Sequence, residues 1–370
     1  MKKIAKYPVT ILFFLFLFSY TVFDMFAPKR DHSDLENRPL EQAPPFSFSS
    51  LFRNEYTPKY EEYIEDQFFL RDSWISLKSR FEYALFKVEN NGVIYGTNGY
   101  QFMGMPTINE DQIERNVNSI RAFASAYPGR VTVMVVPSSS VILADYLPAH
   151  APFADENASL DEIISALSAD TQVIDIRPTL FANNDDYIYY RTDPHWTTDG
   201  AYLAYLEYIS FMQLTPFDTQ SYTRIEVPDF YGTTFSRSKL FNTVPDTLVY
   251  YDLPNSAQID GTVYGLYGLA SLETRDMYAM FIHGNNGLTL VEGNGEGRCL
   301  VIKDSFANCF VPFLTANYAQ IDVVDLRMFS GSVNELIAEN DYDDILILYS
   351  FHIFHTDNML IKLILDLDTA

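Results

Sequence analysis

The chain has 370 residues, of which 48% are hydrophobic and 15% aromatic. This length can form one large domain or two modest ones, and this composition excludes a disordered protein. Acidic residues outnumber basic residues by 49 to 25, which gives a formal net charge of -24. Because an acidic surface repels phosphate backbones, we expect the globular part not to bind nucleic acid.

The N-terminus combines a lysine cluster with an apolar run. Lys2, Lys3 and Lys6 precede the uncharged stretch from Tyr7 to Phe23, which is close to the minimum length that spans a bilayer core of about 30 Å. The stretch has no A-x-A cleavage pattern and no lipobox cysteine, which favours an uncleaved signal anchor over a cleaved signal peptide. The lysines are expected to stay in the cytoplasm, so the remainder lies outside.

The chain after this run begins with a polar, proline-bearing stretch that is typical of a linker. Later segments alternate between strand and helix patterns. We therefore expect four regions, which are a cytoplasmic end at 1–6, a signal anchor or transmembrane helix at 7–27, a stalk and linker at 28–58, and a catalytic domain at 59–370.

Regular alternation of strands and helices dominates the expected catalytic domain. The run Val131–Val136 is rich in β-branched residues, as in strands buried on both faces. Apolar spacing predicts helices at 60–87, 111–126, 159–168, 201–212, 306–317 and 333–339, with a last helix at the C-terminus. Strands are predicted at 93–95, 100–102, 131–136, 172–176, 299–302, 320–324 and 345–349. This order predicts an α/β fold with a mostly parallel sheet that helices cover on both faces.

Residues 215–295 interrupt this alternation. Short aromatic runs with turn residues between them predict strands at 247–251, 262–264, 278–281 and 288–291. We therefore expect a β-rich insertion at about 215–295.

Ser305 follows a predicted strand and begins a predicted helix in the segment Lys303-Asp304-Ser305. Open α/β sheets bind their ligands at this edge, and free backbone N–H groups there can stabilise an oxyanion. A serine at this position is also a common helix cap, so capping remains an alternative interpretation.

Asp193 and His195 flank Pro194, which keeps the segment out of a helix. In extended backbone, residues two apart project to the same side, so the carboxylate can orient the imidazole as a base. The alternative is a local cap for a helix that starts at Thr198 or Asp199. Together with Ser305, the pair supplies a nucleophile, a base and an orienting acid.

Metal and disulfide chemistry are less well supported by the sequence. Cys299 and Cys309 form no C-x-x-C pattern, and we expect two free thiols. Asp193 and His195 could be metal ligands, but no third ligand occurs at a useful spacing. We therefore expect no metal and no cofactor.

Several motifs resemble the DHHW protein family, which is related to the alginate O-acetyltransferase proteins with an SGNH-hydrolase-like domain. The resemblance is carried by Arg191-Thr-Asp-Pro-His-Trp-Thr197 and Lys303-Asp-Ser-Phe-Ala-Asn308, and it covers most of the chain after the expected anchor. Pro194 replaces the first histidine of the motif that names the family. The resemblance implies an SGNH-hydrolase-like three-layer sandwich.

The resemblance also implies roles for individual residues. Ser305 would attack an acyl group, His195 would be the general base, and Asp193 would orient it. Gly284 and Asn285 would supply a second oxyanion donor, although a β-turn explains them equally well. Arg191 and Arg327 would contact substrate or form structural ion pairs.

We therefore expect transfer of an acyl group, most simply acetyl, to a hydroxyl of an extracytoplasmic polysaccharide. The resemblance implies a multi-pass membrane O-acyltransferase as the partner that delivers the acyl group. Two alternatives stay open, which are an esterase of the same chemistry and an inactive polysaccharide-binding scaffold. Secretion after signal cleavage is the alternative to anchoring.

Overall fold

The computed structural model describes residues 7–365 and 367. The described residues divide into two compact units, one formed by residues 7–87 with 239–242 and the other by 88–238 with 243–365 and 367. The division at residues 87 and 88 lies further along the chain than the start of the catalytic domain that we predict at residue 59. Helices occupy much of the stretch between these two positions.

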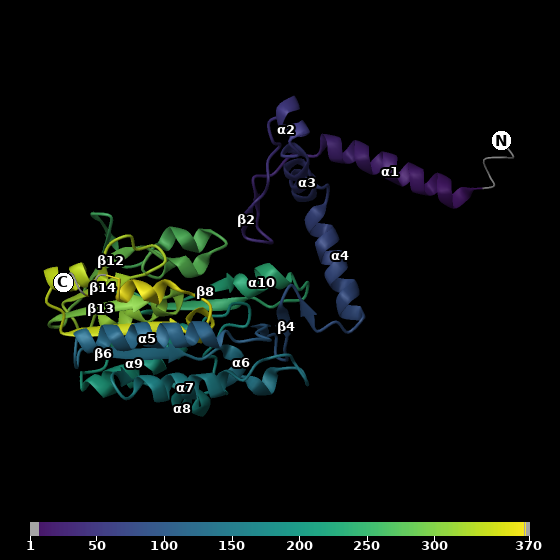
Figure 1. Ribbon diagram of the computed structural model, residues 1–370. Coiled ribbons are helices and arrows are strands. Elements are labelled where there is room, and N and C mark those ends of the chain that lie inside the picture. The colour runs from purple at the N-terminus through teal and green to yellow at the C-terminus, as the bar shows by residue number, and fades with distance from the viewer. Residues whose placement is uncertain (1–6, 366, 368–370) are drawn as a thin grey trace. The chain divides into compact units, whose positions relative to one another are not determined.

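The first unit consists mainly of helices (Figure 1). Its elements are α1 (Pro8–Phe26), β1 (His32–Ser33), β2 (Arg38–Pro39), α2 (Phe48–Phe52), α3 (Tyr56–Gln67) and α4 (Arg71–Ala84). Helix α1 has 19 residues and is long and apolar enough to cross a membrane. The helix predicted at 60–87 is two helices, because Leu70 between α3 and α4 adopts a left-handed backbone with φ 57°.

An eight-stranded sheet forms the centre of the second unit. Its strand order is β11-β10-β12-β14-β13-β15-β6-β7. The strands are β6 (Val131–Val136), β7 (Gln172–Val173), β10 (Ser256–Ile259), β11 (Thr262–Gly265), β12 (Leu288–Glu292), β13 (Arg298–Lys303), β14 (Gln320–Val324) and β15 (Asp344–Ser350). The five strands from β14 to β7 are parallel, whereas β12, β10 and β11 pair antiparallel at one edge. The predicted insertion therefore extends the sheet as well as interrupting the alternation.

A three-stranded sheet, a strand pair and several helices complete the second unit. The three-stranded sheet consists of β3 (Glu89–Asn90), β4 (Val93–Tyr95) and β5 (Gln101–Met103), and the strand pair of β8 (Arg224–Phe230) and β9 (Asp246–Tyr251). The α-helices are α5 (Glu110–Ala126), α6 (Ser139–Ile142), α7 (Glu156–Leu167), α8 (Arg177–Ala182), α9 (Thr198–Met212), α10 (Thr233–Ser238), α11 (Val311–Leu314), α12 (Val333–Glu339) and α13 (Phe351–Phe354). The 3-10 helices are η2 (Ala144–Tyr146), η3 (Thr219–Ser221), η4 (Leu269–Glu273), η5 (Met277–Met280), η6 (Ser305–Cys309) and η7 (Met359–Leu363).

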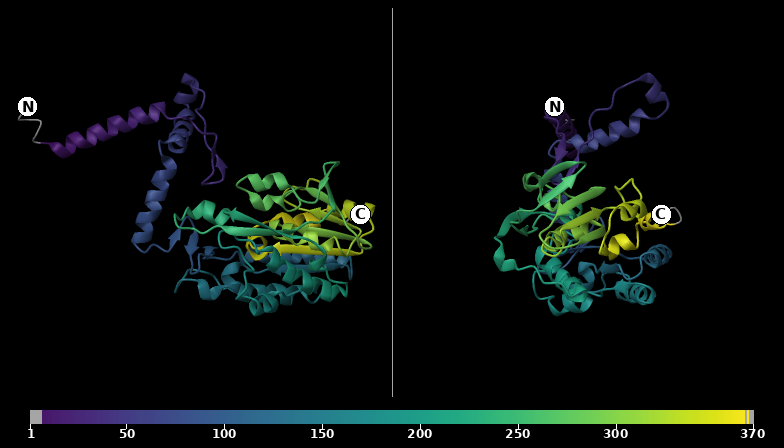
Figure 2. Two further views of the ribbon diagram at one scale, coloured as in Figure 1. Left: turned by 180° about the vertical axis from the view of Figure 1, so that it is seen from behind. Right: turned by 90° about the vertical axis from the view of Figure 1, so that its left-hand side faces the viewer.

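Helices cover both faces of the sheet, as Figure 2 shows in its right-hand view. Alternate residues of β6 point to opposite faces, so Val133 and Val135 join one core while Met134 and Val136 join the other. The first core packs against α5, α7 and α12, and the second against α9. This arrangement confirms the predicted three-layer α/β sandwich with a mostly parallel sheet.

Two further predicted elements, both in the second unit, differ from the structure. The strand predicted at 278–281 is wrong, because residues 277–280 form the 3-10 helix η5. The single helix predicted at 306–317 is divided into η6 and α11. Pro312 lies in the first turn of α11 and has no backbone N–H with which to continue a preceding helix.

The loop between Ile188 and α9 carries Asp193 and His195, and it lies very close to the first turn of that helix. A Cβ atom on Gly200 would lie 2.2 Å from the carbonyl oxygen of Ile188. The same carbonyl accepts a hydrogen bond from the N–H of Thr197, the residue that caps α9. Glycine at position 200 thus allows the loop and the helix to pack.

Glu156 lies buried under the carboxyl end of β6. Its Oε1 accepts a hydrogen bond of 2.7 Å from the N–H of Ser138, whereas its Oε2 has no hydrogen-bond partner among the described residues. Burial raises the pKa of Glu156 to about 7, although the hydrogen bonds from Ser138 oppose this shift. The carboxyl group therefore changes its charge close to neutral pH.

We predict that Gly200→Ala destabilises the protein, because the new methyl group meets backbone that cannot move aside. The free energy of unfolding should fall by about 1–3 kcal/mol, as in other overpacked sites. Urea denaturation of the full chain in detergent measures this change. Gly265→Ala is the matched control, since its Cβ meets no atom within 4 Å. Equal stability of the two variants would contradict the close packing.

A second prediction concerns pH. A raised folded-state pKa stabilises the fold at low pH, and this contribution is lost as the pH rises through about 7. Glu156→Gln should therefore be more stable than the parent by about 1–3 kcal/mol near pH 8, and the difference should shrink as the pH falls below 7 and vanish near pH 4, below the ordinary pKa of a glutamate. Glu162→Gln, at an exposed position on the same helix, should show no such difference. A pH-independent difference between Glu156→Gln and the parent would contradict the assignment.

Candidate active site

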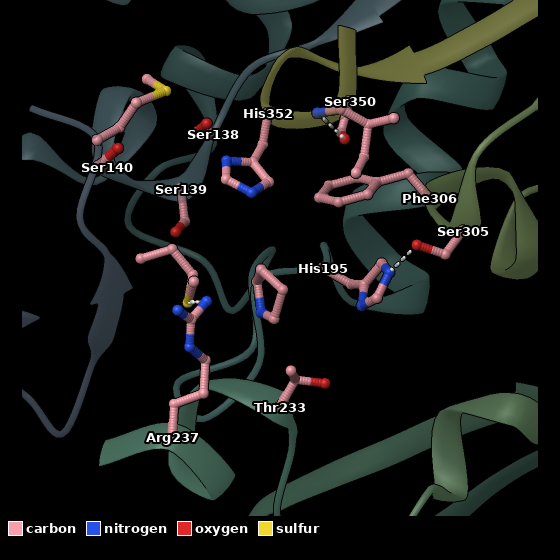
Figure 3. Close-up of a pocket in the computed structure, with 14 residues that line it drawn as sticks. Ser138, Ser139, Ser140, His195, Thr233, Arg237, Ser305, Phe306, Ser350 and His352 are labelled. Carbon is pink, nitrogen blue, oxygen red and sulfur yellow. Dashed lines mark hydrogen bonds between the residues drawn. The ribbon is translucent and has the colours of Figure 1, made fainter. Parts of the chain in front are cut away.

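Ser305, His195 and Asp193 form one continuous chain of hydrogen bonds. Nε2 of His195 lies 2.7 Å from Oγ of Ser305, and Nδ1 lies 2.5 Å from Oδ1 of Asp193 (Figure 3 shows the first of these bonds). Because the carboxylate can only accept, Nδ1 carries the proton and Nε2 is free to accept from the serine hydroxyl. This is the geometry of a serine nucleophile with its base and orienting acid.

Backbone groups hold the Asp193 carboxylate in place. Its Oδ1 also accepts from the N–H of His195, and its Oδ2 accepts from the N–H of Thr233 at 2.8 Å. A Cβ atom on Gly232 would lie 2.4 Å from that Oδ2, so only glycine lets the chain approach so closely. The start of α10 therefore fixes the orienting carboxylate.

The charge state of Asp193 follows from two opposing effects. Burial by itself would raise the pKa of Asp193, but the adjacent His195 and the backbone N–H donors lower that pKa below its usual value. The carboxylate therefore stays ionised at neutral pH. An ionised Asp193 favours a positive charge on His195 when the imidazole accepts a proton.

A second buried carboxylate, Asp246 on β9, supports the loop from Arg191 to His195. It accepts hydrogen bonds from the N–H groups of Arg191 and Thr192 and from the hydroxyl groups of Thr192 and Tyr187. Burial raises the pKa of Asp246, which these donors counteract. The carboxylate joins the loop to a strand of the inserted region.

Asp304 shapes the turn that presents Ser305. Its Oδ1 accepts from the N–H of Phe306 at 2.9 Å, and its Oδ2 accepts from the N–H and the hydroxyl of Ser350 at 2.8 and 2.5 Å. Asp304, rather than Ser305, is the residue that caps the helical turn. The Ser305 hydroxyl is therefore free to bond with His195.

Aromatic residues hold the two reacting segments together. Tyr278 stacks on the His195 ring with 4.0 Å between centroids, and its hydroxyl donates to the carbonyl of Ser305 at 3.1 Å. The indole N–H of Trp196 donates to the carbonyl of Phe306 at 2.9 Å. These contacts limit the movement of the imidazole relative to the serine.

The Ser305–His195 pair opens into a cavity of about 270 Å³. The carboxyl ends of β13, β15 and β6 meet at this edge, as expected for a parallel sheet. The lining residues combine hydroxyl groups, apolar side chains and one arginine, and they are Met103, Met105, Ser138, Ser139, Ser140, Pro194, His195, Thr233, Arg237, Ser305, Phe306, Ser350, His352 and Ile353. No aspartate or glutamate is among these lining residues.

The other four predicted site residues do not line this cavity. The amide oxygen of Asn285 accepts from Nζ of Lys303 at 2.7 Å and from the amide of Asn308, and Gly284 has the positive φ of a turn. Arg327 forms a two-fold ion pair with Asp325. The Arg191 guanidinium lies over the rings of Tyr187 and Tyr100. These contacts support the turn and the structural interactions that the sequence left as alternatives.

Cysteines and metal ligands give no second site in the part of the chain that the structure describes. Cys299 and Cys309 are both free and buried. Burial raises the pKa of Cys309 to about 12. Among residues 7–365 and 367, no group of three His, Cys, Asp or Glu side chains is arranged to hold a metal ion.

The sequence did not identify several residues that complete the site. Asp304 was visible only as the residue before Ser305, and Ser350 only as the end of a predicted strand. Asp246, Tyr278 and Arg237 occur in segments without a recognisable motif. Their importance arises from contacts between segments that are far apart in the chain.

Comparisons with known proteins agree with this architecture. The crystal structure of a DHHW family protein from Eubacterium siraeum is similar to this chain. The match covers 74% of this chain and 96% of that protein, with a TM-score of 0.65 and 23% sequence identity. Bacillus cereus PatB1, solved with a sulfonyl adduct, matches 72% of this chain and 97% of its own, with a TM-score of 0.60 and 22% identity. These likenesses confirm the SGNH-hydrolase-like fold.

A curated relative is the probable alginate O-acetylase AlgJ of Pseudomonas fluorescens. It is 25% identical over 169 residues, and the match spans 42% of each chain. The family model for DHHW proteins matches residues 93–324, which include Asp193, His195 and Ser305. The match covers more than half of the chain and includes the Asp-x-His-Trp and Lys-Asp-Ser segments. The chain therefore belongs to the DHHW protein family.

Proposed function

We propose that this protein is an extracytoplasmic serine O-acetyltransferase that modifies a polysaccharide through an acyl-serine intermediate. The observation that carries the proposal is the hydrogen-bonded chain from Asp193 through His195 to Ser305 at the edge of an open cavity. The likeness to a probable alginate O-acetylase supports acetyl as the group and polysaccharide as the acceptor class.

The first half-reaction would load the serine. Nε2 of His195 takes the hydroxyl proton of Ser305 as Oγ attacks the carbonyl carbon of the acetyl donor. The N–H of Ser305 lies at the start of the η6 turn, free of the turn's own hydrogen bonds, and it can donate to the developing oxyanion. The bond to the donor then breaks, and the imidazolium protonates the leaving group.

The second half-reaction would return the enzyme to its starting state. A sugar hydroxyl enters the cavity and gives its proton to His195 as its oxygen attacks the acetyl carbon. The ester bond to Ser305 breaks, and the serine oxygen recovers a proton from the imidazolium. The products are an acetylated sugar and the free enzyme, so no cofactor is required for the balance.

Location and partner belong to the same proposal. Helix α1 would hold the chain in the cytoplasmic membrane as a single span with the catalytic unit outside. Acetyl-CoA is a cytoplasmic metabolite, so the acetyl group would cross the membrane through a multi-pass O-acyltransferase. The acceptor would be a polysaccharide of the cell surface or a secreted one.

We predict that the parent protein forms a transient acetyl adduct with an activated acetyl ester, and that Ser305→Ala does not. Intact-mass spectrometry of the full chain in detergent detects the adduct. Ser125→Ala, on the surface of α5, is the control and should behave as the parent. An adduct that persists in Ser305→Ala would contradict the assignment of the nucleophile. Release of the adduct by oligosaccharide rather than by water distinguishes a transferase from an esterase.

A further prediction concerns the orienting acid. Asp193→Asn keeps an oxygen for the N–H of Thr233 but cannot fix the proton on Nδ1 of His195 as a carboxylate does. The rate of hydrolysis of the activated ester should fall by about 10²- to 10⁴-fold, with little change in thermal stability. Asp199 forms its ion pair with Arg224 in an accessible position, away from the triad, so Asp199→Asn should retain the parent's rate. A full rate in Asp193→Asn would contradict the role of the carboxylate.

A further inference from the structure

Arg237 lies in the cavity without an acidic partner. Its only hydrogen bond from the guanidinium to another described residue is a contact of 3.8 Å from Nη1 to the sulfur of Met103. Among the described residues, it forms no ion pair with a carboxylate. Figure 3 shows the Arg237 side chain pointing into the cavity from α10. With no carboxylate among the described residues to neutralise it, the guanidinium is available for an anionic ligand.

The surroundings of Arg237 favour an anion. The cavity lining contains no acidic residue, although the chain as a whole has a net charge of -24. Burial lowers the pKa of the neighbouring His352, and the positive charge of Arg237 lowers that pKa further, although the buried Asp304 opposes the shift. His352 is therefore mainly neutral near pH 7 and leaves the guanidinium as the fixed positive charge. An anion that is repelled by the rest of the surface is attracted at this position.

Hydroxyl groups next to the guanidinium are also available to a ligand. Ser139 and Ser140 line the cavity, and their side chains form no hydrogen bond with another described residue. A sugar ring or an anionic substituent offers acceptors for such hydroxyl donors. The part of the lining that follows β6 therefore offers free hydroxyl groups, while Met103, Met105 and Ile353 supply apolar surface.

Helix α10 connects Arg237 with the catalytic residues. Thr233 and Arg237 are four residues apart, so both lie on the face of α10 that lines the cavity. The N–H of Thr233 holds Asp193, as described above. The rise along the helix from Thr233 to Arg237 is about 6 Å. The same turn of α10 therefore both holds the Asp193 carboxylate and carries the guanidinium.

We propose that Arg237 binds an anionic substituent, a carboxylate or a phosphate, on the acceptor saccharide and so presents a neighbouring hydroxyl to acetyl-Ser305. A guanidinium donates two parallel hydrogen bonds to either group, which fixes the orientation of the sugar as well as its position. The role given to the sugar hydroxyl rests on the proposed function, whereas the binding of the anion does not. Arg237 would thereby determine which polysaccharides are accepted.

Equilibrium binding to the Ser305→Ala variant of the full chain in detergent tests this proposal without any acyl transfer. Four probes form two matched pairs, which are tetragalacturonate with its methyl ester and maltotetraose phosphate with maltotetraose. At least one anionic probe should bind about 10-fold or more tightly than its neutral match, since charged hydrogen bonds are roughly twice as strong as neutral ones. The two pairs distinguish a carboxylate from a phosphate.

Adding Arg237→Gln should remove this preference, whereas Arg237→Lys should retain part of it and show a similar dependence on salt. Arg121→Gln, on the exposed face of α5, is the matched control and should leave the preference unchanged. The proposal is overturned if neither anionic probe binds more tightly than its neutral match, or if the preference survives in Arg237→Gln. If Ser305→Ala shows the preference for an anionic probe but the parent protein transfers no acetyl group, the proposed function is contradicted and the role of Arg237 in binding is not.

Discussion

The hydrogen bond from the Trp196 indole to the carbonyl of Phe306 joins the two chain segments on which the candidate chemistry depends. These segments are 110 residues apart in the sequence, and one carries His195 while the other carries Ser305. Trp196 is fully buried, so losing this bond would leave the Phe306 carbonyl with only the weak thiol donor of Cys309 in the core. Tyr278 reinforces the junction from the inserted region, because it contacts the imidazole and the serine carbonyl together. The 2.7 Å contact between base and nucleophile is therefore a consequence of core packing.

Two buried carboxylates near this junction serve different purposes because they face different partners. Asp193 faces a histidine that can become positive, and its pKa is lowered despite burial. Asp246 accepts its hydrogen bonds from neutral donors, with the Arg191 guanidinium further away at 3.9 Å, and burial raises the pKa of Asp246. The first can stabilise the charge that develops on His195, while the second holds the loop that carries it. Gly232 then brings α10 against Asp193, and the same short helix carries Arg237 to the cavity. The contacts between α10 and Asp193 therefore fix both the catalytic carboxylate and the position of Arg237.

The distribution of charge follows a similar logic. Behind the nucleophile turn, the buried Lys303 interacts with Asp325, which is also paired with Arg327. Burial lowers the pKa of Lys303 to about 8, and Asp325 opposes that shift. These charges compensate one another inside the protein, and no aspartate or glutamate lines the cavity. An acidic protein can therefore present a positive cavity, because the sign of the local field is set by the few groups that line it.

The sequence by itself determined the alternation of strands and helices, the strand–helix position of Ser305 and the extended Asp193-Pro194-His195 pair. Each of these depends on neighbours within a few residues, where periodicity and proline chemistry are decisive. The family resemblance linked the two motifs, but their contact is formed only by the fold. Only the tertiary structure revealed that residues 277–280 form a 3-10 helix, that Asn285 and Arg327 make structural contacts, and that Arg237 enters the cavity. The physical reason is that a local pattern sets the backbone of a segment, whereas the partners of a side chain are set by how distant segments pack.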